Sequence, residues 1–362
     1  MDFSQRLLSW YLNNSRDLPW RHSSDPYQTW LSEVILQQTR MEQGVVYFNR
    51  FIKAYPDVFS LARATEEEVL LLWQGLGYYS RARNLHAAAR HIAGVRKGVF
   101  PKTSDEWMQI KGVGPYTAAA IASIASGEII PAIDGNVYRI LSRLFMVDHS
   151  IDAPEGKRMI QHIAQELIDK DRPGDFNQAM MDFGSLVCRP ANPACISCMF
   201  AIECKAFRNG KVADYPIRNK KRKPRPRYFN YCFIYVRKAG HDIQFCVQQR
   251  KGRDIWKHLY EWPLLETTER LSFDDGFFHG SWLGDVIPNE MAYKVKGKPI
   301  HLKHQLTHQT IFAQVFLICI EPSHEQALKN RYRLVYPDAF EVLAKPRLIE
   351  LAYQEVMASL PG

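Results

Sequence analysis

The sequence predicts a multidomain protein, with an all-α first part of about 210 residues and a smaller α+β part behind it. Apolar residues recur at the helical period of 3.6 through the first part, and no strand pattern occurs before residue 228. After that residue the period changes to 2, in the runs YFNYCFIYV (228–236) and IQFCVQQR (243–250). A chain of 362 residues, 46% hydrophobic and 23% charged, is long and apolar enough for two globular domains.

The net charge of the chain predicts a polyanionic partner. The charge is +9 at pH 7, which favours nucleic acid or a membrane surface. The longest apolar run, AAAIASIA (118–125), is too short to span a bilayer. The first residues, MDFSQRLLSWYL, mix acidic and polar residues with apolar ones, as an amphipathic helix does and a signal peptide does not. We therefore expect a cytoplasmic protein without a membrane segment.

Helical patterns account for most of the first part. One apolar stripe covers residues 3–13, and RDLPWR (16–21) follows as a loop. Asp25 and Pro26 begin the next helix, 25–40, as an N-cap followed by proline at the first helical position. The further helices that we expect lie at 42–55, 66–73, 79–93, 104–110, 154–169 and 173–187.

Two acidic residues have both a structural and a functional interpretation. Glu33 lies in the helix 25–40 beside Val34 and Ile35, and its structural interpretation is a solvated glutamate on a helix edge. Asp134 lies in PAIDGN (131–136), directly before another helix, and its structural interpretation is an N-cap.

The stretch IKGVGPYTAAAIAS (110–123) joins two glycines to an alanine-rich helix. Gly112 and Gly114 let the backbone approach a ligand closely, and the helix N-terminus that follows directs N–H groups toward an anion. Such a hairpin can hold a phosphate without any side chain, although an ordinary glycine turn between helices would have the same sequence. A second glycine turn, GLGYYSR (75–81), carries two tyrosines.

Four cysteines within seventeen residues form the most specific chemical pattern of the chain. They follow the spacing C-x6-C-x2-C-x5-C, at Cys188, Cys195, Cys198 and Cys204. Four thiolates on one short loop suit a tetrahedral metal or an iron–sulfur cluster, and chemistry alone leaves zinc and iron–sulfur both open. A disulfide pair or chance clustering is disfavoured, because nothing else in the sequence is typical of a secreted protein.

A basic stretch separates the two parts. NKKRKPRPR (219–227) holds six basic residues, two prolines and no acid. We interpret residues 218–227 as an interdomain linker, either a solvated tether or one that contacts phosphates. The second domain then covers residues 228–362. Its further expected elements are a turn at KAGHD (238–242), a strand at TIFAQVFLICI (310–320) and a closing helix at PRLIELAYQEVMASL (346–360).

Several motifs occur in the order of one known family. They are SEVILQQTR, GLGYYSRARNLH, KGVGPYTAAAI, IDGNVYRILSR and the cysteine loop, with the α+β domain behind them. The chain resembles the MutY-type adenine DNA glycosylases of the helix-hairpin-helix superfamily, which includes endonuclease III. The resemblance is dense over residues 3–210 and looser afterwards. It implies a helical glycosylase domain (1–217), with the hairpin at 110–123 and an iron–sulfur loop at 188–204, followed by a Nudix-like domain (228–362).

The resemblance implies an enzyme that flips adenine, mispaired with 8-oxoguanine or guanine, out of DNA and cuts its glycosidic bond. Glu33 matches the family's catalytic acid, which protonates N7 of adenine, and its apolar neighbours would help to keep it protonated near neutral pH. Asp134 matches the anion that stabilises the developing sugar cation, and Tyr116 matches a tyrosine that positions both groups. The ligands of a [4Fe–4S] cluster are matched by Cys188, Cys195, Cys198 and Cys204.

The resemblance also assigns residues to the two bases and the DNA strand. The family positions that line the adenine pocket are occupied here by Arg16, Trp20, Arg21 and Gln178. The family positions that contact the damaged base and the DNA are occupied here by Gln38, Thr39, Leu76, Tyr78, Gly112 and Gly114. Among these, Gln38 and Tyr78 would wedge into the base stack, whereas we expect Tyr79 to pack in the core. The implied protein is a monomer that acts on double-stranded DNA and is associated with the nucleoid in the cytoplasm.

The second domain is expected to read the lesion and not to hydrolyse pyrophosphate. LYEWP (259–263) resembles a signature of the Nudix-like domain, but the sequence contains no G-x5-E-x7-REUxEE box. The family's lesion-contacting loop is usually Phe-Ser-His. Here the matching residues are Leu306, Thr307 and His308, so the hydroxyl and the imidazole are kept and the aromatic ring is not.

Two other functions compete with this interpretation. A bifunctional endonuclease III-like glycosylase/lyase for oxidised pyrimidines would carry a lysine just after the hairpin, where this chain has Pro115 and Tyr116. Water is therefore the expected final nucleophile. A non-catalytic iron–sulfur DNA-binding protein would not need Glu33 and Asp134 together.

Overall fold

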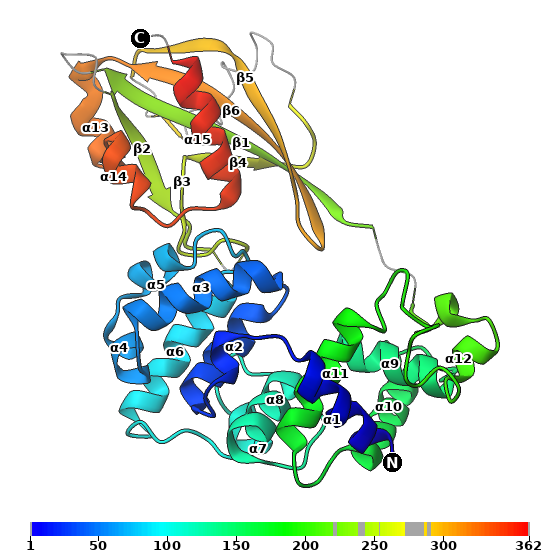
Figure 1. Cartoon of the computed structure of the whole chain (residues 1–362). Coiled ribbons are helices and arrows are strands. Elements are labelled where there is room, and N and C mark those ends of the chain that lie inside the picture. The colour runs from blue at the N-terminus through cyan, green and yellow to red at the C-terminus, as the bar shows by residue number, and fades with distance from the viewer. Residues whose placement is uncertain are drawn as a thin grey trace. The chain divides into compact units, whose positions relative to one another are not determined.

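The chain divides into two compact units in the computed structural model (Figure 1). The first unit holds Met1–Ala64 and Asn84–Lys221, and the second holds Thr65–Arg83 together with Arg222–Gly362. The structure describes residues 2–219, 223–237, 243–252, 254–271, 286–287 and 291–360. The predicted turn KAGHD and the linker residues 220–222 therefore lie outside the described residues.

The first unit is built of α-helices, as predicted. They are α1 (Phe3–Asn14), α2 (Pro26–Leu36), α3 (Met41–Ala54), α4 (Val58–Arg63), α6 (Ser80–Gly94), α7 (Ser104–Met108), α8 (Pro115–Ser126), α9 (Gly135–Phe145), α10 (Pro154–Leu167), α11 (Pro173–Leu186) and α12 (Lys205–Arg208). The side chain of Asp25 caps α2 by accepting from the N–H of Tyr27, and Pro26 is the first helical residue. The helix ends at Leu36 and not at residue 40, because the φ of Gln38 is +58°, which an α-helix does not allow.

Helix α11 lies at the centre of the first unit and packs against α1, α8 and α9. Phe176, Met180 and Phe183 lie on one face of α11 and are at most 2% exposed. They form one hydrophobic core with Leu7 of α1 and Leu141 of α9. This core fixes the helices that carry the cavity described below. No helix in the described parts of the chain is long and apolar enough to cross a membrane.

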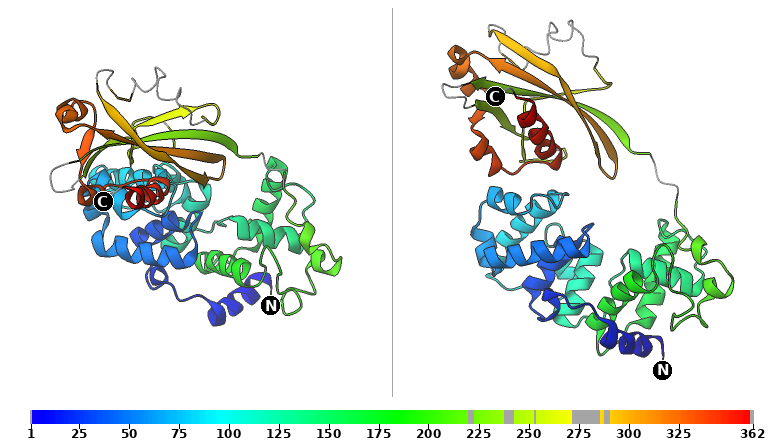
Figure 2. Two further views of the ribbon diagram at one scale, coloured as in Figure 1. Left: turned by 90° about the horizontal axis from the view of Figure 1, so that it is seen from above. Right: turned by 45° about the horizontal axis from the view of Figure 1, so that its top comes forward.

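The described residues of the second unit form a seven-stranded sheet of the predicted α+β type. Its strands are β1 (Arg225–Arg237), β2 (Ile243–Gln249), β3 (Tyr260–Glu261), β4 (Leu264–Thr267), β5 (Tyr293–Gln305), β6 (Gln309–Ile320) and β7 (Arg333–Val335). The strand order is β3-β2-β1-β6-β5, with β4 also paired to β1 and β7 also paired to β2. Strands β1 and β6 run parallel side by side (Figure 2). Because β1 begins at Arg225, the last residues of the stretch 218–227 are strand and not linker.

The two faces of β1 enter different hydrophobic cores, because alternate side chains of a strand point to opposite faces. Phe229, Tyr231 and Phe233 enter one core, and Cys232 and Ile234 enter the other. The first core is covered by α15, the long helix across the sheet in Figure 1. The helices of this unit are α5 (Glu66–Leu72), α13 (Glu325–Lys329), α14 (Pro337–Glu341) and α15 (Arg347–Ser359).

The segment 65–83 belongs to the second unit, to which hydrogen bonds connect it. The hydrophobic periodicity of the sequence does not predict these long-range contacts. The amide of Gln74 donates to Glu350 at 3.0 Å, and the hydroxyl of Tyr79 donates to the carbonyl of Lys345 at 3.1 Å. Tyr79 is 5% exposed, so the prediction that it packs in a core is confirmed.

Candidate active site

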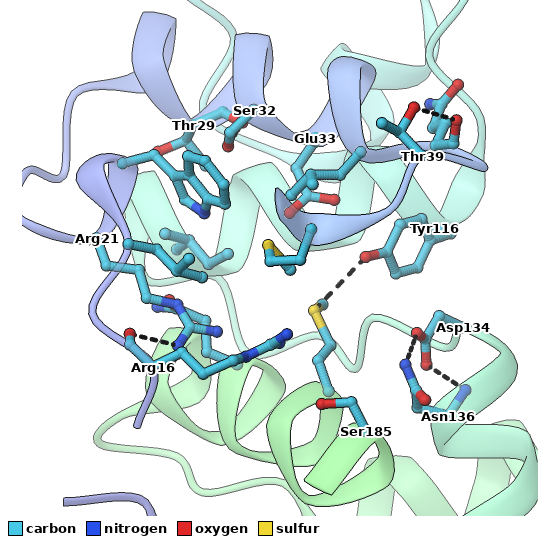
Figure 3. A pocket seen from close by; sticks show the side chains of 18 of the residues that line it. Arg16, Arg21, Thr29, Ser32, Glu33, Thr39, Tyr116, Asp134, Asn136 and Ser185 are labelled. Carbon is cyan, nitrogen blue, oxygen red and sulfur yellow. Dashed lines mark hydrogen bonds between the residues drawn. The ribbon is translucent and has the colours of Figure 1, made fainter. Parts of the chain in front are cut away.

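A cavity of about 570 Å³ opens in the first unit among α2, α8, α9 and α11 (Figure 3). The structure brings together there both predicted carboxylates, the predicted tyrosine and all four predicted pocket residues. The predicted residues that line it are Arg16, Trp20, Arg21, Glu33, Gln38, Thr39, Tyr116, Asp134 and Gln178. Six residues predicted to contact the DNA or the lesion are not among the described lining residues: Leu76, Tyr78, Gly112, Gly114, Thr307 and His308.

Glu33 is buried near the end of α2. It is 8% exposed, and its neighbours Val34 and Ile35 are 5% and 0% exposed. Burial raises the pKa of Glu33 to about 7; a hydrogen bond from Tyr116 lowers it, and the charge of Asp134 raises it further. A solvated glutamate on a helix edge is therefore the wrong interpretation, and this carboxyl is partly protonated at neutral pH.

Tyr116 lies in the first turn of α8, directly after Pro115. Its hydroxyl donates to the sulfur of Met181 at 3.6 Å and is close enough to Glu33 to lower the pKa of that carboxyl. Burial, followed by the charges of Glu33 and Asp134, raises the pKa of Tyr116 well above its usual value. The hydroxyl therefore stays a hydrogen-bond donor on the wall between Glu33 and Asp134 (Figure 3).

Asp134 caps α9 and lines the cavity at the same time. One carboxylate oxygen accepts from the N–H of Asn136 at 2.8 Å and of Val137 at 2.9 Å, and the other accepts from the Asn136 side chain at 2.6 Å. Burial raises the pKa of Asp134 above its usual value, although these hydrogen bonds oppose the shift. The N-cap interpretation is therefore right, and it leaves the carboxylate facing the cavity (Figure 3).

Arg16 and Arg21 are held at the opposite end of the cavity by Asp182, which the sequence analysis did not identify. Asp182 is 0% exposed, and Arg21 donates to its two oxygens at 2.7 and 3.0 Å. The Nε of Arg16 donates to the same carboxylate at 2.8 Å. Burial alone would raise the pKa of Asp182, but the two guanidinium groups outweigh burial and hold it below its usual value. The buried Nε of Arg21 has no hydrogen-bond partner among the described residues.

Trp20 and Gln178 complete the predicted pocket. Trp20 is 8% exposed and packs edge-on against Phe48, with 5.1 Å between ring centroids. The carbonyl oxygen of Gln178 accepts from the hydroxyl of Tyr11 at 3.4 Å, which orients the amide. The hydroxyl groups and the thioethers on the wall were not predicted: Thr29, Ser32, Ser185, Met41 and Met181.

Gln38 and Tyr78, the two predicted wedge residues, share an uncommon backbone conformation. Their φ angles are +58° and +47°, in the left-handed region that residues other than glycine seldom occupy. Tyr78 is also 49% exposed. This geometry suits side chains that are presented to a partner. Leu76, in contrast, is only 7% exposed.

The predicted hairpin forms between α7 and α8. Gly112 has a φ of +85°, and a Cβ there would lie 2.6 Å from the Cβ of Asn84. The fold therefore requires glycine at this position. Gly114 caps α8 without a side chain, and a Cβ there would meet nothing within 4 Å, so the N-terminus of α8 stays open.

The predicted lesion-contacting residues lie at the tip of the hairpin between β5 and β6. The N–H of Leu306 donates to the carbonyl of Gln309 at 2.8 Å and closes the turn. Thr307 and His308 are exposed, and the hydroxyl of Thr307 is hydrogen-bonded to the hydroxyl of Tyr78. Leu306, at the position of the family's aromatic residue, packs against the core of the unit.

The four clustered cysteines surround a second, small cavity of about 30 Å³. All seven cysteines are free thiols and all are described, so the disulfide interpretation is wrong. Arg143 donates to the sulfur of Cys188 at 3.5 Å and to the carbonyl of Arg189 at 2.8 Å. Burial raises the pKa of Cys198 to about 11, and the other three thiols have a smaller influence. In the described parts of the chain, no group of three or more His, Cys, Asp or Glu side chains is arranged for a single metal ion.

Arg139 of α9 links the cysteine loop to the cavity, and the sequence analysis also missed it. Its Nε donates to the carbonyl of Cys188 at 2.7 Å, and one of its terminal nitrogens donates to the side chain of Asn136 at 2.8 Å. Asn136 in turn donates to Asp134. A Cβ on Gly184 would lie 2.5 Å from the Cβ of Asn136, so only glycine leaves room for this arrangement. These hydrogen bonds connect the cysteine loop to Asp134 through Arg139 and Asn136.

Comparison with known proteins identifies both halves of the chain. Residues 31–170 match the HhH-GPD superfamily of base excision DNA repair proteins, and residues 232–355 match the NUDIX domain. An adenine DNA glycosylase of Buchnera aphidicola subsp. Acyrthosiphon pisum is 35% identical over 268 residues, which are 74% of this chain and 75% of that protein. The chain belongs to the adenine DNA glycosylase family.

Other relatives of the family differ in length. An adenine DNA glycosylase of Arabidopsis thaliana is 34% identical over 298 residues, which cover 73% of this chain but only 47% of that protein. The solved structure of a thermostable thymine-DNA glycosylase superposes with a TM-score of 0.54 at 25% identity, over 57% of this chain and 95% of that one. The family assignment confirms the predicted fold, a helical glycosylase domain followed by a Nudix-like domain.

Residues that sequence reasoning missed differ in whether a signal was present. Asn136 and Arg139 lie in IDGNVYRILSR, where Arg139 stands among the apolar residues Val137, Ile140 and Leu141 and could have been suspected of a structural role. Asp182 lies between Met181 and Phe183 with no pattern around it, and only the folded chain brings it to the arginines.

Proposed function

We propose that this protein is an adenine DNA glycosylase that removes adenine mispaired with 8-oxoguanine or guanine. The observation that carries the proposal is a buried acid, Glu33, in one cavity with a second carboxylate, Asp134. The name and similarity of the relatives in Buchnera and Arabidopsis support it. A base inside a duplex cannot reach such a cavity, so the substrate adenine must be flipped out of the stack, at a cost of a few kcal/mol.

Glu33 is the proposed general acid. Adenine is a poor leaving group unless its ring is protonated, and N7 is the nitrogen that the acid would protonate. A carboxyl with a pKa of about 7 still carries a proton at physiological pH, as a general acid must. The hydroxyl of Tyr116 would turn from the sulfur of Met181 to donate to this carboxyl and orient it.

Asp134 is the proposed stabiliser of the sugar. Loss of adenine leaves positive charge on the deoxyribose, and an anion in a water-poor cavity stabilises that charge strongly. The backbone N–H groups and the Asn136 side chain hold the Asp134 carboxylate in one orientation. Water would complete the reaction and leave an abasic site, because Pro115 and Tyr116 occupy the positions where a lyase would carry lysine.

The far end of the cavity is proposed to recognise the base. The Arg21 guanidinium would offer donors, and the Gln178 amide offers both a donor and an acceptor. Trp20 supplies an apolar wall beside them. Asp182 neutralises part of the charge of the two arginines, so that a neutral base can bind there.

The cysteine loop is proposed to hold a [4Fe–4S] cluster. Cys188, Cys195, Cys198 and Cys204 line one apolar cavity, and this donor set suits a cubane cluster, with Arg143 offsetting its negative charge. A bound cluster supplies structural rigidity here. Through Arg139 and Asn136, that rigidity would orient Asp134.

Double-stranded DNA is the proposed partner of both domains, 1–217 and 228–362. Gly112 and Gly114 at the open N-terminus of α8 would grip a phosphate, and Gln38 and Tyr78 would enter the stack. Thr39, Leu76, Thr307 and His308 would contact 8-oxoguanine. We further propose that the protein acts as a monomer on DNA of the nucleoid.

Single-turnover release of adenine tests the proposal. Duplexes with adenine opposite 8-oxoguanine, guanine and thymine are compared, with wild type, Glu33→Gln and Asp134→Asn. Wild type should release adenine from the first two duplexes, and each variant should lose about a hundred- to a thousandfold in rate, the usual size of such an electrostatic contribution. Release from none of the duplexes would refute the proposal. Trapping with borohydride on duplexes with oxidised pyrimidines would instead identify the bifunctional alternative.

A further inference from the structure

One hydroxyl group in the cavity of Glu33 has two competing acceptors. The hydroxyl of Tyr116 donates to the sulfur of Met181 at 3.6 Å, the contact drawn as a dashed line from Tyr116 in Figure 3. The same hydroxyl is close enough to Glu33 to lower the pKa of that carboxyl. A tyrosine hydroxyl carries a single hydrogen, so it donates fully to only one of these groups at a time. The competition between the sulfur and the carboxyl therefore decides whether Tyr116 orients Glu33.

The thioether is the weaker of the two acceptors. The sulfur of methionine accepts hydrogen bonds weakly, whereas a carboxylate oxygen accepts them strongly. Met181 therefore releases the hydroxyl of Tyr116 readily to Glu33. The other charged groups that act on Glu33 are Asp134, the cap of α9, and Arg21, in the short helix Pro19–Arg21.

The sulfur of Met181 lies where a small oxidant can reach it. Met181 is half-buried on α11 and lines the cavity of about 570 Å³, which is many times the volume of a water molecule. Its neighbour Met180, in contrast, is 1% exposed and belongs to the hydrophobic core. Hydrogen peroxide is little larger than water, so we expect it to react with Met181 and not with Met180. The proposed lesion, 8-oxoguanine, is itself a product of such oxidants.

Oxidation of Met181 would reverse the order of the two acceptors. A lone pair of the sulfur attacks one oxygen of hydrogen peroxide, the O–O bond breaks, and the other oxygen leaves as water. The sulfur loses two electrons and becomes a sulfoxide, which is polar and carries an oxygen that accepts hydrogen bonds strongly. This oxygen would hold the hydroxyl of Tyr116 and leave Glu33 without its hydrogen bond. The acid would then be less well oriented toward N7 of adenine.

We propose that Met181 is an oxidation site through which peroxide slows the enzyme, because its sulfoxide withdraws Tyr116 from Glu33. Enzymatic reduction of the sulfoxide restores the thioether, so the modification is reversible. The loss of rate rests on the proposed function. The oxidation of Met181 and the loss of the hydrogen bond to Glu33 do not.

Limited treatment of the full chain with hydrogen peroxide tests the proposal, with peptide mass mapping and single-turnover adenine release measured on the same samples. Met181 should be oxidised at doses that leave Met180 intact. The rate should fall about tenfold as Met181 is converted, the usual contribution of one hydrogen bond to a charged group. Methionine sulfoxide reductase should restore the rate. Oxidation of Met108 and Met159, which are 45% and 41% exposed, should have no effect of its own.

Three variants assign the effect to one sulfur. Met181→Leu removes the acceptor at nearly equal volume, so peroxide should not change its rate from its own untreated value. Met181→Gln supplies a strong amide acceptor, so it should be slow before treatment and unaffected by it. Met41→Leu removes the other thioether among the described lining residues and is the matched control, which should stay as sensitive to peroxide as wild type. All three variants keep the cysteine loop, so oxidation of the thiols contributes equally.

The pKa of Glu33 provides a readout that needs no turnover. The hydrogen bond from Tyr116 lowers this pKa, so its loss should raise the pKa above its value of about 7. Infrared difference spectra of the carboxyl band, with Glu33→Gln subtracted, measure the pKa before and after oxidation. An unchanged pKa with Met181 oxidised, a Met181 that resists peroxide while Met108 and Met159 react, or equal sensitivity of Met181→Leu and wild type would each overturn the proposal. A lack of adenine release from the untreated protein would instead refute the catalytic proposal alone.

Discussion

Burial and the nearby charge of Asp134 both raise the pKa of Glu33. Two carboxylates that line one cavity and are shielded from solvent cannot easily be ionised together. Asp134 accepts three hydrogen bonds at the N-terminus of α9, whereas Glu33 has apolar neighbours on α2. The anion is therefore placed on Asp134 and the proton on Glu33, which is the division of labour that glycosidic bond cleavage needs.

The rate of adenine release should follow the protonation of Glu33. With a pKa of about 7, the acid form is lost as the pH rises through that value, so the single-turnover rate should fall above pH 7 by about tenfold per pH unit. Glu33→Gln should be slow and without this pH dependence. A wild-type rate that stays constant from pH 6 to 9 would remove Glu33 as the acid.

The stability of the folded chain should also fall as Glu33 loses its proton. The unfolded chain ionises Glu33 at its ordinary pKa of 4.5 and the folded chain at about 7, so stability from this residue is complete below 4.5 and is lost as the pH rises through 7. Glu33→Gln should therefore be more stable than wild type at pH 8, by up to about 3 kcal/mol, and not at pH 4. Urea unfolding at both pH values measures the difference, and an equal difference at both would contradict the raised pKa.

Asp182→Ala should destabilise the first unit strongly. The change leaves Arg16 and Arg21 without their buried counter-charge, which typically costs about 3–5 kcal/mol. Thermal unfolding gives the size of the effect. Glu155→Ala, which breaks the exposed pair with Arg158 on α10, is the control and should have no measurable effect. If the two variants melt alike, Asp182 does not hold the arginines.

Thr307→Ala with His308→Ala should weaken the preference for 8-oxoguanine over guanine. The N7–H of 8-oxoguanine can donate a hydrogen bond to a hydroxyl, whereas N7 of guanine carries no hydrogen. One such contact discriminates between the two bases by about 1–3 kcal/mol. The ratio of single-turnover rates on the two duplexes measures the preference. Thr310→Ala, in the same hairpin, is the control. An unchanged ratio in the double variant would assign lesion reading to other residues.

Cys198→Ser should lose iron and DNA affinity together. Metal analysis and DNA binding are measured on the same preparation, with Cys319→Ser, outside the cysteine loop, as the control that keeps both. Stoichiometric zinc without iron in the wild type would refute the proposed cluster, because four thiolates also suit zinc.

The helices of the first unit and the residues of its cavity could be predicted from the sequence more completely than the strands of the second unit. Asp25, Pro26 and the apolar stripe of α2 are local signals, and the family motifs carry Glu33 and Asp134. Strand β5 was not predicted because an irregularity between Lys296 and Ile300 interrupts its alternation of apolar and charged residues and shifts the phase of that alternation. Strands β3 and β7 are too short to show any period.

Long-range partners could not be predicted for a different reason. Asp182 gains its role only from Arg16 and Arg21, and Thr307 meets Tyr78 only in the folded second unit. Neither relationship leaves a pattern in the letters around it, so a single sequence contains no signal of the pairing.

The parallel pairing of β1 with β6 has a consequence for synthesis of the protein on the ribosome. Arg225 to Val236 pair with Gln309 to Ile320, so β1 leaves the ribosome long before the strand that completes its hydrogen bonds. During that interval YFNYCFIYV is an uncharged, β-prone segment without a partner along the edge that later pairs with β6, the kind of sequence that aggregates or recruits chaperones. The basic residues of NKKRKPRPR directly before it act as gatekeepers, since like charges keep such nascent segments of neighbouring chains apart.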